Sequence, residues 1–523
     1  MTLREAIERV IINNESLQAK MLEAEIARRQ FKAEKGIFEP AVVGSFERID
    51  THRENTIEQQ ISLGGRREYA DRGNTYNGGL EFLSPIGSKF RLGYNLRETK
   101  NSLNSALPDG EFVSTIGVTL TQPLLKNFGT GATLARIRLA AISSDLAYQD
   151  YRRQMMLTLS RAESAYWDLY FSQEQARISA DSLQTAQAIY DDNKARVEVG
   201  KSSELEVLQS EAGVSLRRAR RGDAMQRLAE AANQLNTLFS GTGGETNISV
   251  WAAEEPEVRE VTLNFYDGYG AAIENNPDYL TRKHQAIAEN VRLAYTKNQR
   301  LPQLDLKGSY GLNGLGLNPD ESHEDLSHSR FPAWSVGVEF RIPVTGGIRE
   351  RNEYAAAKLA KQKSLVGLKE IEVQLGNALS TAILKVNNLR ESVENHRSVI
   401  SFHQRLLENQ VTRMQAGVID SRTVLETEEK LFEARVALLE NLVSYQKSLL
   451  ELELVKGTTL ASRNIDLTKA ELQEMTQRFL STHRFAGPEF DAIRAEVENE
   501  YRTRLKKLDA NERQEGIIDR VFH

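Results

Sequence analysis

The chain has 523 residues, of which 40% are hydrophobic and 27% charged, a composition that is typical of a folded protein and excludes wholesale disorder. Its 67 Lys and Arg residues are balanced by 73 Asp and Glu residues, and the net charge of −6 argues against a nucleic-acid partner. The absence of cysteine excludes disulfides, thiolate zinc sites and a cysteine nucleophile.

The first residues predict an amphipathic helix and lack the apolar core of about 7 to 15 residues that marks a secretion signal. Either a signal was removed or none existed. No stretch approaches the ~20 apolar residues of a membrane-spanning helix, so if the chain crosses a bilayer we expect it to do so as a β-barrel.

The sequence is duplicated. Two adjacent asparagines and a following proline recur with the same spacing, as Asn13, Asn14 and Pro40 and as Asn275, Asn276 and Pro302. We therefore predict two copies of one unit, residues 1–240 and 262–457, with a linker at 241–261 and a charged tail at 458–523. Each unit is expected to contain a helix, strands, a very long helix, a turn and a return helix.

Alternating apolar and polar residues predict strands at about 41–123 in the first unit and about 302–343 in the second. The clearest alternation includes Trp334, Val336 and Val338, which point to one side. Other strands are expected near 90–96, 112–120 and 304–312, and weaker ones at 41–49 and 56–63. The Pro, Gly and Ser residues of 84–88 predict a hairpin turn.

Two proline-free stretches follow the strands, at about 131–199 and 348–416. An unbroken helix of this length would span on the order of 100 Å. Apolar residues recur in both at the three-then-four step of a coiled coil. Because a glycine follows each stretch, we predict two long helical hairpins that turn near Gly200 and Gly417.

The strand pattern leaves two architectures open. The first is a soluble coiled-coil scaffold with a small β domain; the second is a channel whose strands face lipid on one side and water on the other. A channel needs several chains, because even a small barrel needs about eight strands.

We find no catalytic motif and expect no enzyme, cofactor or metal site. A basic cluster on the first return helix is expected to be solvated: Arg217, Arg218, Arg220 and Arg221.

The duplicated asparagine–proline opening, the Leu-Thr-Gln-Pro-Leu-Leu stretch at 120–125 and the Val-Leu pair after each glycine turn together resemble the TolC-like outer-membrane efflux proteins over residues 2–457. The resemblance implies an α+β membrane protein of a Gram-negative bacterium, a homotrimer. Its 12-stranded β-barrel, four strands per chain, would sit in outer-membrane lipid above a long α-helical coiled-coil barrel in the periplasm. It further implies a passive exit duct of a tripartite efflux pump or type I secretion system, docked to a periplasmic adaptor and an inner-membrane transporter.

The resemblance also implies the functional residues. The adaptor-docking tips would be Val199, Gly200, Lys201 and Ser202, and Ala416, Gly417, Val418 and Ile419. An acidic ring at the periplasmic entrance would use Glu206 and Glu426, with Thr423 at the position of another acid; alternatively, both acids are solvated residues near helix N-termini. The polar latch of the best-known family member falls on Ile419 and Met414, which cannot form it; Arg422 or Arg413 could substitute.

Overall fold

The structure is a computed structural model that describes residues 1–65, 67–104, 106–107, 109–200, 203–239, 250–259, 263–328, 331–344, 346–465 and 468–482. The chain forms two compact units, Met1–Ile465 and Asp466–His523. In the second unit the described part contains α12 (Lys469–Thr482). Most of the predicted tail, from residue 483 onward, lies outside the described residues.

The first half of the larger unit starts with two helices, continues into four strands and ends in a long helical hairpin. In chain order, its elements are α1 (Leu3–Asn13), α2 (Glu15–Lys35), η1 (Gly36–Phe38), β1 (Ala41–Glu54), α3 (Ile57–Ser62), β2 (Glu68–Leu83), β3 (Lys89–Asn101), β4 (Glu111–Pro123), α4 (Thr130–Thr133), α5 (Ala135–Glu198) and α6 (Glu204–Leu238).

The second half follows the same order with fewer strands. Its elements are α7 (Phe265–Asn275), α8 (Pro277–Gln299), β5 (Gln303–Gly316), α9 (Pro319–Ser327), β6 (Phe331–Arg341), α10 (Ile348–Gln415), α11 (Ser421–Lys456) and η2 (Ala461–Arg463). Helices α5 and α10 confirm the two long helices that the sequence predicts, within a few residues at each end.

Two features of the first half differ from the expectations. The strand expected at 56–63 is wrong, because this segment contains helix α3. Thr56 starts that helix with a capping box, in which its side chain accepts a hydrogen bond from the Gln59 amide and the Gln59 side chain accepts one from the Thr56 amide. Strand β2 was not anticipated in full, because Gly73, Gly78 and Gly79 interrupt its alternation.

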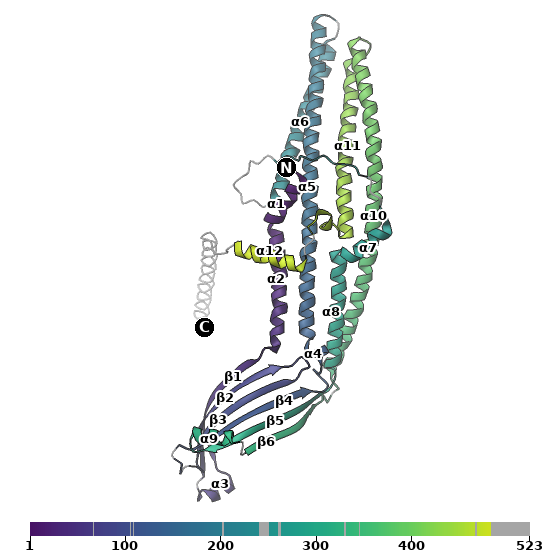
Figure 1. Cartoon of the computed structure of the whole chain (residues 1–523). Coiled ribbons are helices and arrows are strands. Elements are labelled where there is room, and N and C mark those ends of the chain that lie inside the picture. The colour runs from purple at the N-terminus through teal and green to yellow at the C-terminus, as the bar shows by residue number, and fades with distance from the viewer. Residues whose placement is uncertain are drawn as a thin grey trace, which may run out of the picture. The chain divides into compact units, whose positions relative to one another are not determined.

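The six strands form one antiparallel sheet in the order β1-β2-β3-β4-β5-β6, at the opposite end of the unit from the helical turns (Figure 1). The pairing of β4, β5 and β6 aligns apolar residues on one face and polar residues on the other: Val118, Tyr310 and Trp334 against Thr119, Ser309 and Ser335. Six strands are two more than the four per chain that the resemblance implies.

Helix α9 packs on the apolar face of the sheet. The Ser114 hydroxyl donates a hydrogen bond of 2.8 Å to the Ser322 carbonyl oxygen, and the His323 ring stacks on Tyr94 with 5.5 Å between ring centroids. This helix covers only part of β4 and β5, and the rest of the apolar face stays exposed, including Trp334 at 74%.

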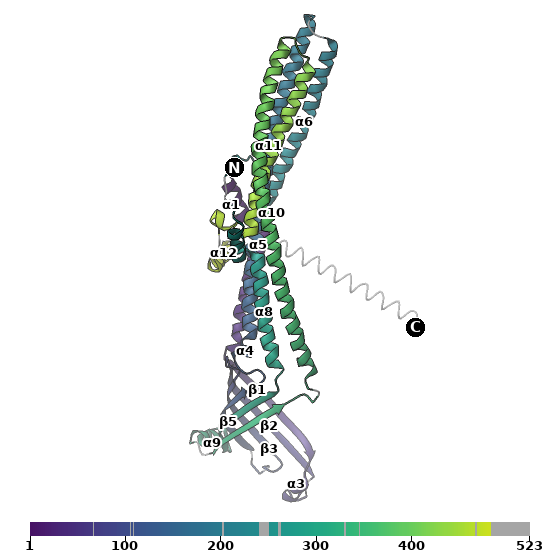
Figure 2. The same cartoon turned by 90° about the vertical axis from the view of Figure 1, so that its right-hand side faces the viewer.

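The long helices pair as α5 with α6 and α10 with α11 and extend side by side (Figures 1 and 2). One core lies where α5 meets α1, α6 and α11 and includes the fully buried Tyr166, Leu169 and Leu235. A second core joins α10 to α11 around Leu379 and Tyr445. None of the described helices is both long enough and apolar enough to cross a membrane.

Candidate functional site

The two helical hairpins turn at the same end of the larger unit (Figures 1 and 2). Gly200 has φ of +71° and Gly417 has φ of +74°, a left-handed conformation that favours glycine. After α10 the Gly417 amide donates to the Met414 carbonyl oxygen and the Val418 amide to the Arg413 carbonyl oxygen, each at 2.9 Å. These bonds satisfy carbonyl groups at the helix end, as glycine-terminated helices commonly do. The turns at both predicted glycines are therefore confirmed.

The residues beside these glycines include exposed apolar side chains. Val199 ends α5 with 67% of its surface exposed, and Val418 is 63% exposed. Ala416 is the C-cap of α10. Lys201 and Ser202 of the predicted docking tip lie outside the described residues.

The predicted ring residues have different local partners. Glu206 lies in the first turn of α6, where its amide donates to the Ser203 side chain at 3.3 Å. The Glu426 carboxylate accepts a hydrogen bond of 2.8 Å from the Arg422 guanidinium, and both side chains are largely exposed. At this position of α11 a positive charge therefore accompanies the acid.

Thr423 is hydrogen-bonded to Asp420, the N-cap residue of α11. Its hydroxyl and amide both donate to the Asp420 carboxylate, at 2.5 and 3.1 Å. These two hydrogen bonds lower the pKa of the Asp420 carboxyl. Asp420 is thus an ionised acid beside the second turn. Comparison with the family's acidic positions does not find it, although an Asp just before a helix is a recognisable N-cap signal.

The two positions of the family's latch pack into an apolar cluster. Met414 and Val424 are buried together with Ile189 of α5, and Ile419 packs against them. Arg196 of α5 also donates a hydrogen bond of 3.0 Å to the Met414 carbonyl oxygen. The cluster joins α5, α10 and α11, so apolar packing holds these helices together where the resemblance places a polar latch.

A buried ion pair links the two return helices. The Arg217 guanidinium of α6 donates to the Glu428 carboxylate of α11, with 2.8 Å from its Nε, and only 4% and 7% of the two side chains is exposed. The same guanidinium also donates to the Ser182 hydroxyl and to the Leu425 carbonyl oxygen, each at 3.2 Å. The expectation that Arg217 is solvated is therefore wrong.

Arg220 also reaches the other hairpin. Its guanidinium lies 2.5 Å from the Glu429 carboxylate. Between α6 and α11 the structure has a groove of about 760 Å³, lined by Leu216, by Arg217 and by the pair of Arg220 with Glu429. The basic cluster is thus partly a connection between the two halves of the chain.

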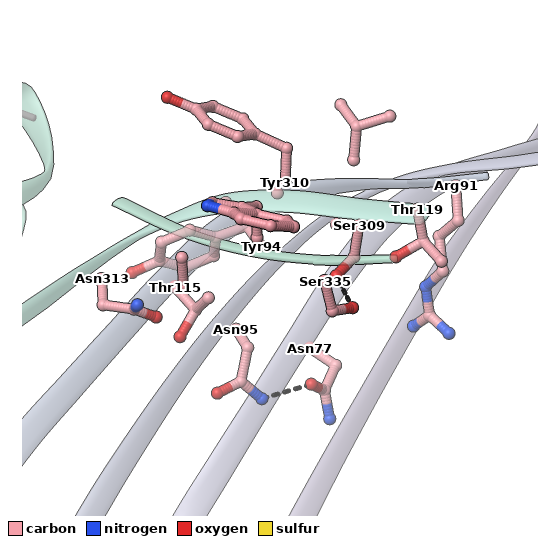
Figure 3. Close-up of a pocket in the computed structure, with 16 residues that line it drawn as sticks. Asn77, Arg91, Tyr94, Asn95, Thr115, Thr119, Ser309, Tyr310, Asn313 and Ser335 are labelled. Carbon is pink, nitrogen blue, oxygen red and sulfur yellow. Dashed lines mark hydrogen bonds between the residues drawn. The ribbon is translucent and has the colours of Figure 1, made fainter. Parts of the chain in front are cut away.

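The other notable surface is the polar face of the sheet. Figure 3 shows Asn77, Asn95 and Thr115 on one side of the strands and Tyr310 on the other. Asn95 donates a hydrogen bond to Asn77, and the Ser309 and Ser335 hydroxyls share one across β5 and β6. Among the described residues no group of three or more His, Asp or Glu side chains is placed to hold a metal ion. The sheet therefore has one polar face and one apolar face.

Residues 6–241 and 268–458 match the family described as outer membrane efflux protein. The probable efflux pump outer membrane protein TtgC of Pseudomonas putida is 21% identical over 362 residues, which cover 68% of this chain and 70% of the relative. The outer membrane protein OprJ of Pseudomonas aeruginosa is 21% identical over 454 residues, or 86% of this chain and 82% of the relative.

Two solved structures have a similar fold. The outer membrane channel CmeC of Campylobacter jejuni has a TM-score of 0.64 at 16% identity, with 91% of this chain and 89% of that chain covered. The outer membrane protein VceC of Vibrio cholerae has a TM-score of 0.61 at 17% identity, with 87% and 96% covered. Since the family match spans most of the sequence and the fold agrees, the chain belongs to the outer membrane efflux protein family.

Proposed function

We propose that the chain is one subunit of a homotrimeric, passive exit duct in the outer membrane of a Gram-negative bacterium. The observation that carries this proposal is the exposed apolar face of the sheet. The side chains of Trp334, Val336 and Val338 are 74%, 69% and 64% exposed. A soluble scaffold would cover these residues with a helix or a second sheet, whereas lipid covers them in a barrel.

The helices provide a second argument for assembly. Leu359, Val366 and Val373, here called the α10 stripe, follow one another at seven-residue intervals and are 66%, 69% and 56% exposed. Seven-residue spacing is the repeat of a coiled-coil seam. Because α10 already packs on α8 and α11, the α10 stripe is a further apolar seam, and a second copy of the chain fits it.

The two tandem units are supported by the repeated asparagines. Asn14 caps α2 and donates from its side chain to the Leu238 carbonyl oxygen, at the end of α6, at 3.4 Å. Asn276 caps α8 and donates in the same way to the Val455 carbonyl oxygen, near the end of α11, at 3.0 Å. In each half one amide therefore joins the start of a helix to the end of the return helix, which explains why the second asparagine of each pair recurs.

In the proposed trimer the polar sheet faces enclose water in the outer membrane, and the helices continue the passage through the periplasm. The resemblance implies a barrel of twelve strands, whereas three copies of the six-stranded sheet would supply eighteen. The TtgC relative is named as an efflux pump component, which supports a periplasmic adaptor and an inner-membrane transporter as partners of this chain.

We place adaptor docking at residues 199–202 and 416–419 and the entrance ring at Glu206 and Glu426, with Thr423 beside them. The exposed Val199 and Val418 support the docking assignment, because apolar side chains at the ends of long helices favour protein contacts.

Membrane fractionation tests the proposal. We expect the chain in the outer-membrane fraction, and we expect it to be purified in detergent as a trimer that light scattering identifies by mass. A monomer that stays in buffer without detergent would instead establish the soluble scaffold.

The docking assignment is tested separately at the second turn. Gly417→Pro cannot adopt the positive φ of this position, whereas Gly417→Asn tolerates it. We expect Gly417→Pro to impair adaptor-dependent export of a pump substrate while the trimer remains intact, and Gly417→Asn to export near the level of the parent protein. Full export by Gly417→Pro would contradict docking at this turn.

A further inference from the structure

Only four of the six strands connect to the long helical part of the unit. β1 follows α2, β4 leads to α5, β5 follows α8 and β6 leads to α10. β2 and β3 instead join each other through the turn at 84–88, on the side of the sheet that faces the helices. A four-stranded subunit lacks such an extra hairpin. Whether β2 and β3 stay in the sheet therefore determines the width of the wall that the assembled subunits form.

The turn between β2 and β3 is fixed to the rest of the fold. The Ser84 amide donates to the Ser88 carbonyl oxygen at 2.8 Å, and the Gly129 amide donates to the Ile86 carbonyl oxygen at 3.0 Å. The Ser88 hydroxyl also donates to the Gln122 side chain at the end of β4. These bonds attach the hairpin to the connection between β4 and α5.

Backbone pairing continues through the extra hairpin. The register is unbroken in the β1-β2 and β2-β3 ladders, from Ala41 opposite Glu81 to Glu54 opposite Glu68 and from Asp71 opposite Asn101 to Leu83 opposite Lys89. The β3-β4 ladder is also continuous, from Lys89 opposite Thr121 to Thr99 opposite Glu111. A hairpin that left the sheet to plug the lumen would have to break one of these ladders.

The extra hairpin has the same two faces as the rest of the sheet. On the apolar face Phe82 stacks on Phe90 with 4.8 Å between centroids, and Phe46 meets Tyr76 at 5.1 Å. On the polar face lies Asn77, at the level of the polar residues of β3 to β6 (Figure 3). The alternation of apolar and polar residues is that of a wall between lipid and water.

The two outer strands of the sheet, β1 and β6, run in opposite directions, because consecutive strands are antiparallel and their number is even. The β6 edge of one copy can therefore pair with the β1 edge of the next in the usual antiparallel manner. We infer, building on the trimer proposed above, that a second copy of the chain occupies each edge and that three chains, three times six strands, close an eighteen-stranded wall.

Strand number sets the width of such a wall. With strands about 4.8 Å apart and tilted by about 40°, a closed backbone cylinder measures roughly 24 Å across for twelve strands and roughly 36 Å for eighteen. Barrels of sixteen to eighteen strands leave an aqueous channel in porins. In this duct the eighteen-stranded wall is therefore wide enough to enclose an aqueous channel.

Disulfide trapping tests the strand order, since the chain has no cysteine of its own. Ser335→Cys on the polar face of β6 is combined, one at a time, with cysteines on the polar face of β1 at Val43, Ser45, Glu47 and Ile49. We expect at least one pair to convert most chains in oxidised outer membranes into linked dimers and trimers that a reductant separates. Matched pairs of Ser335→Cys with Arg91→Cys or Arg97→Cys on β3 should give no more linkage than Ser335→Cys alone.

A second pair reports whether β3 remains in the wall. Asn95 and Thr115 lie opposite each other on β3 and β4, so Asn95→Cys with Thr115→Cys should form a bond within one chain. A trimer that links β6 to β3, that gives no link to β1, or that lacks the bond between 95 and 115 overturns the eighteen-stranded wall and leaves the trimer standing. A chain that is a monomer and is never linked overturns the trimer itself.

Discussion

The long helices α5 and α10 have nearly the same length, 64 and 68 residues, but different surroundings. α5 packs against α2, α6, α8 and α11 and buries Tyr166 and Trp167 in the main core. α10 packs mainly on α8 and α11 and leaves the α10 stripe exposed. The two long helices therefore differ in place: α5 lies inside the subunit and α10 at its edge. Substitutions in α5 should affect folding of the subunit, and those in the exposed part of α10 should affect assembly.

The largest expected effect is at the ion pair that joins the two halves. Arg217→Met leaves the buried Glu428 carboxylate without its partner, and breaking a buried pair typically costs ~3–5 kcal/mol. We expect a loss of this size in the free energy of unfolding, measured by denaturant titration in detergent.

The matched control removes both charges. Arg217→Met with Glu428→Met leaves no buried unpaired charge, so it should recover most of the lost stability. If the single and double variants are equally unstable, packing of the arginine side chain and not its charge holds α6 against α11.

The next effect separates assembly from folding. Val366→Asp and Val373→Asp each place a charge on the α10 stripe and remove ~1.5–3 kcal/mol of apolar burial per valine if a second copy covers it. We expect the trimer to dissociate at lower detergent concentrations and at higher protein concentrations than the parent trimer, as seen by light scattering, with little change in the helicity of the monomer.

Leu379 provides the opposite case on the same helix. It is fully buried in the core between α10 and α11, so Leu379→Ala should lower the stability of the subunit by ~2–5 kcal/mol. A stripe variant that behaved like Leu379→Ala would show that the α10 stripe serves the fold of one chain.

The sequence predicts the helical part of the fold well because the signal there is local and repeated. The coiled-coil step and the proline-free stretches locate α5 and α10, and Gly200 and Gly417 locate their ends. Strand β2 is harder, since the glycines at 73, 78 and 79 remove the apolar alternation, and a side chain at 73 or 79 would collide with the backbone of β3. The capping box at Thr56 would have identified α3.

The site is only partly predictable for another reason. The Arg217 and Glu428 side chains meet although the residues are 211 positions apart, and only the packing of α6 on α11 brings them together. Sequence alone shows two ordinary charged residues on helices. The partner of Glu426, by contrast, is Arg422 at four residues' distance, a spacing that sequence can recognise.

A smaller effect concerns the pH dependence of a second link between the halves. Glu163 of α5 is 2% exposed and is hydrogen-bonded by Arg463. Burial raises the pKa of the Glu163 carboxyl, and Arg463 only partly opposes this. A raised pKa in the folded state gives stability that is present below the unfolded value of about 4.5 and is lost as pH rises through the folded value.

We therefore expect the parent protein to lose this contribution as pH rises above about 4.5 and Glu163→Gln, which stays neutral, to lose less over the same range. Thermal unfolding at a series of pH values measures the difference. Glu451→Gln removes an acid from an exposed pair with Lys385 and should leave the pH profile unchanged. An identical slope for the parent and Glu163→Gln would show that the carboxyl has the same pKa in the folded and unfolded states.

The smallest effect on stability, and the sharpest test of the two tips, comes from the ring acids. Glu426 belongs to an exposed ion pair with Arg422, so Glu426→Ala should change stability by less than ~0.5 kcal/mol. If Glu426 lies at the entrance, as proposed, the positive charge of Arg422 offsets part of its field there. Glu206 lies on the other hairpin, in the first turn of α6. In planar bilayers Glu206→Ala and Glu426→Ala should each reduce cation selectivity, and Arg422→Ala should increase it. Equal, unchanged selectivity in all three variants would place both acids on solvated helix ends away from the passage, and the ring would have to be sought elsewhere, with Asp420 as the next acid beside the second turn.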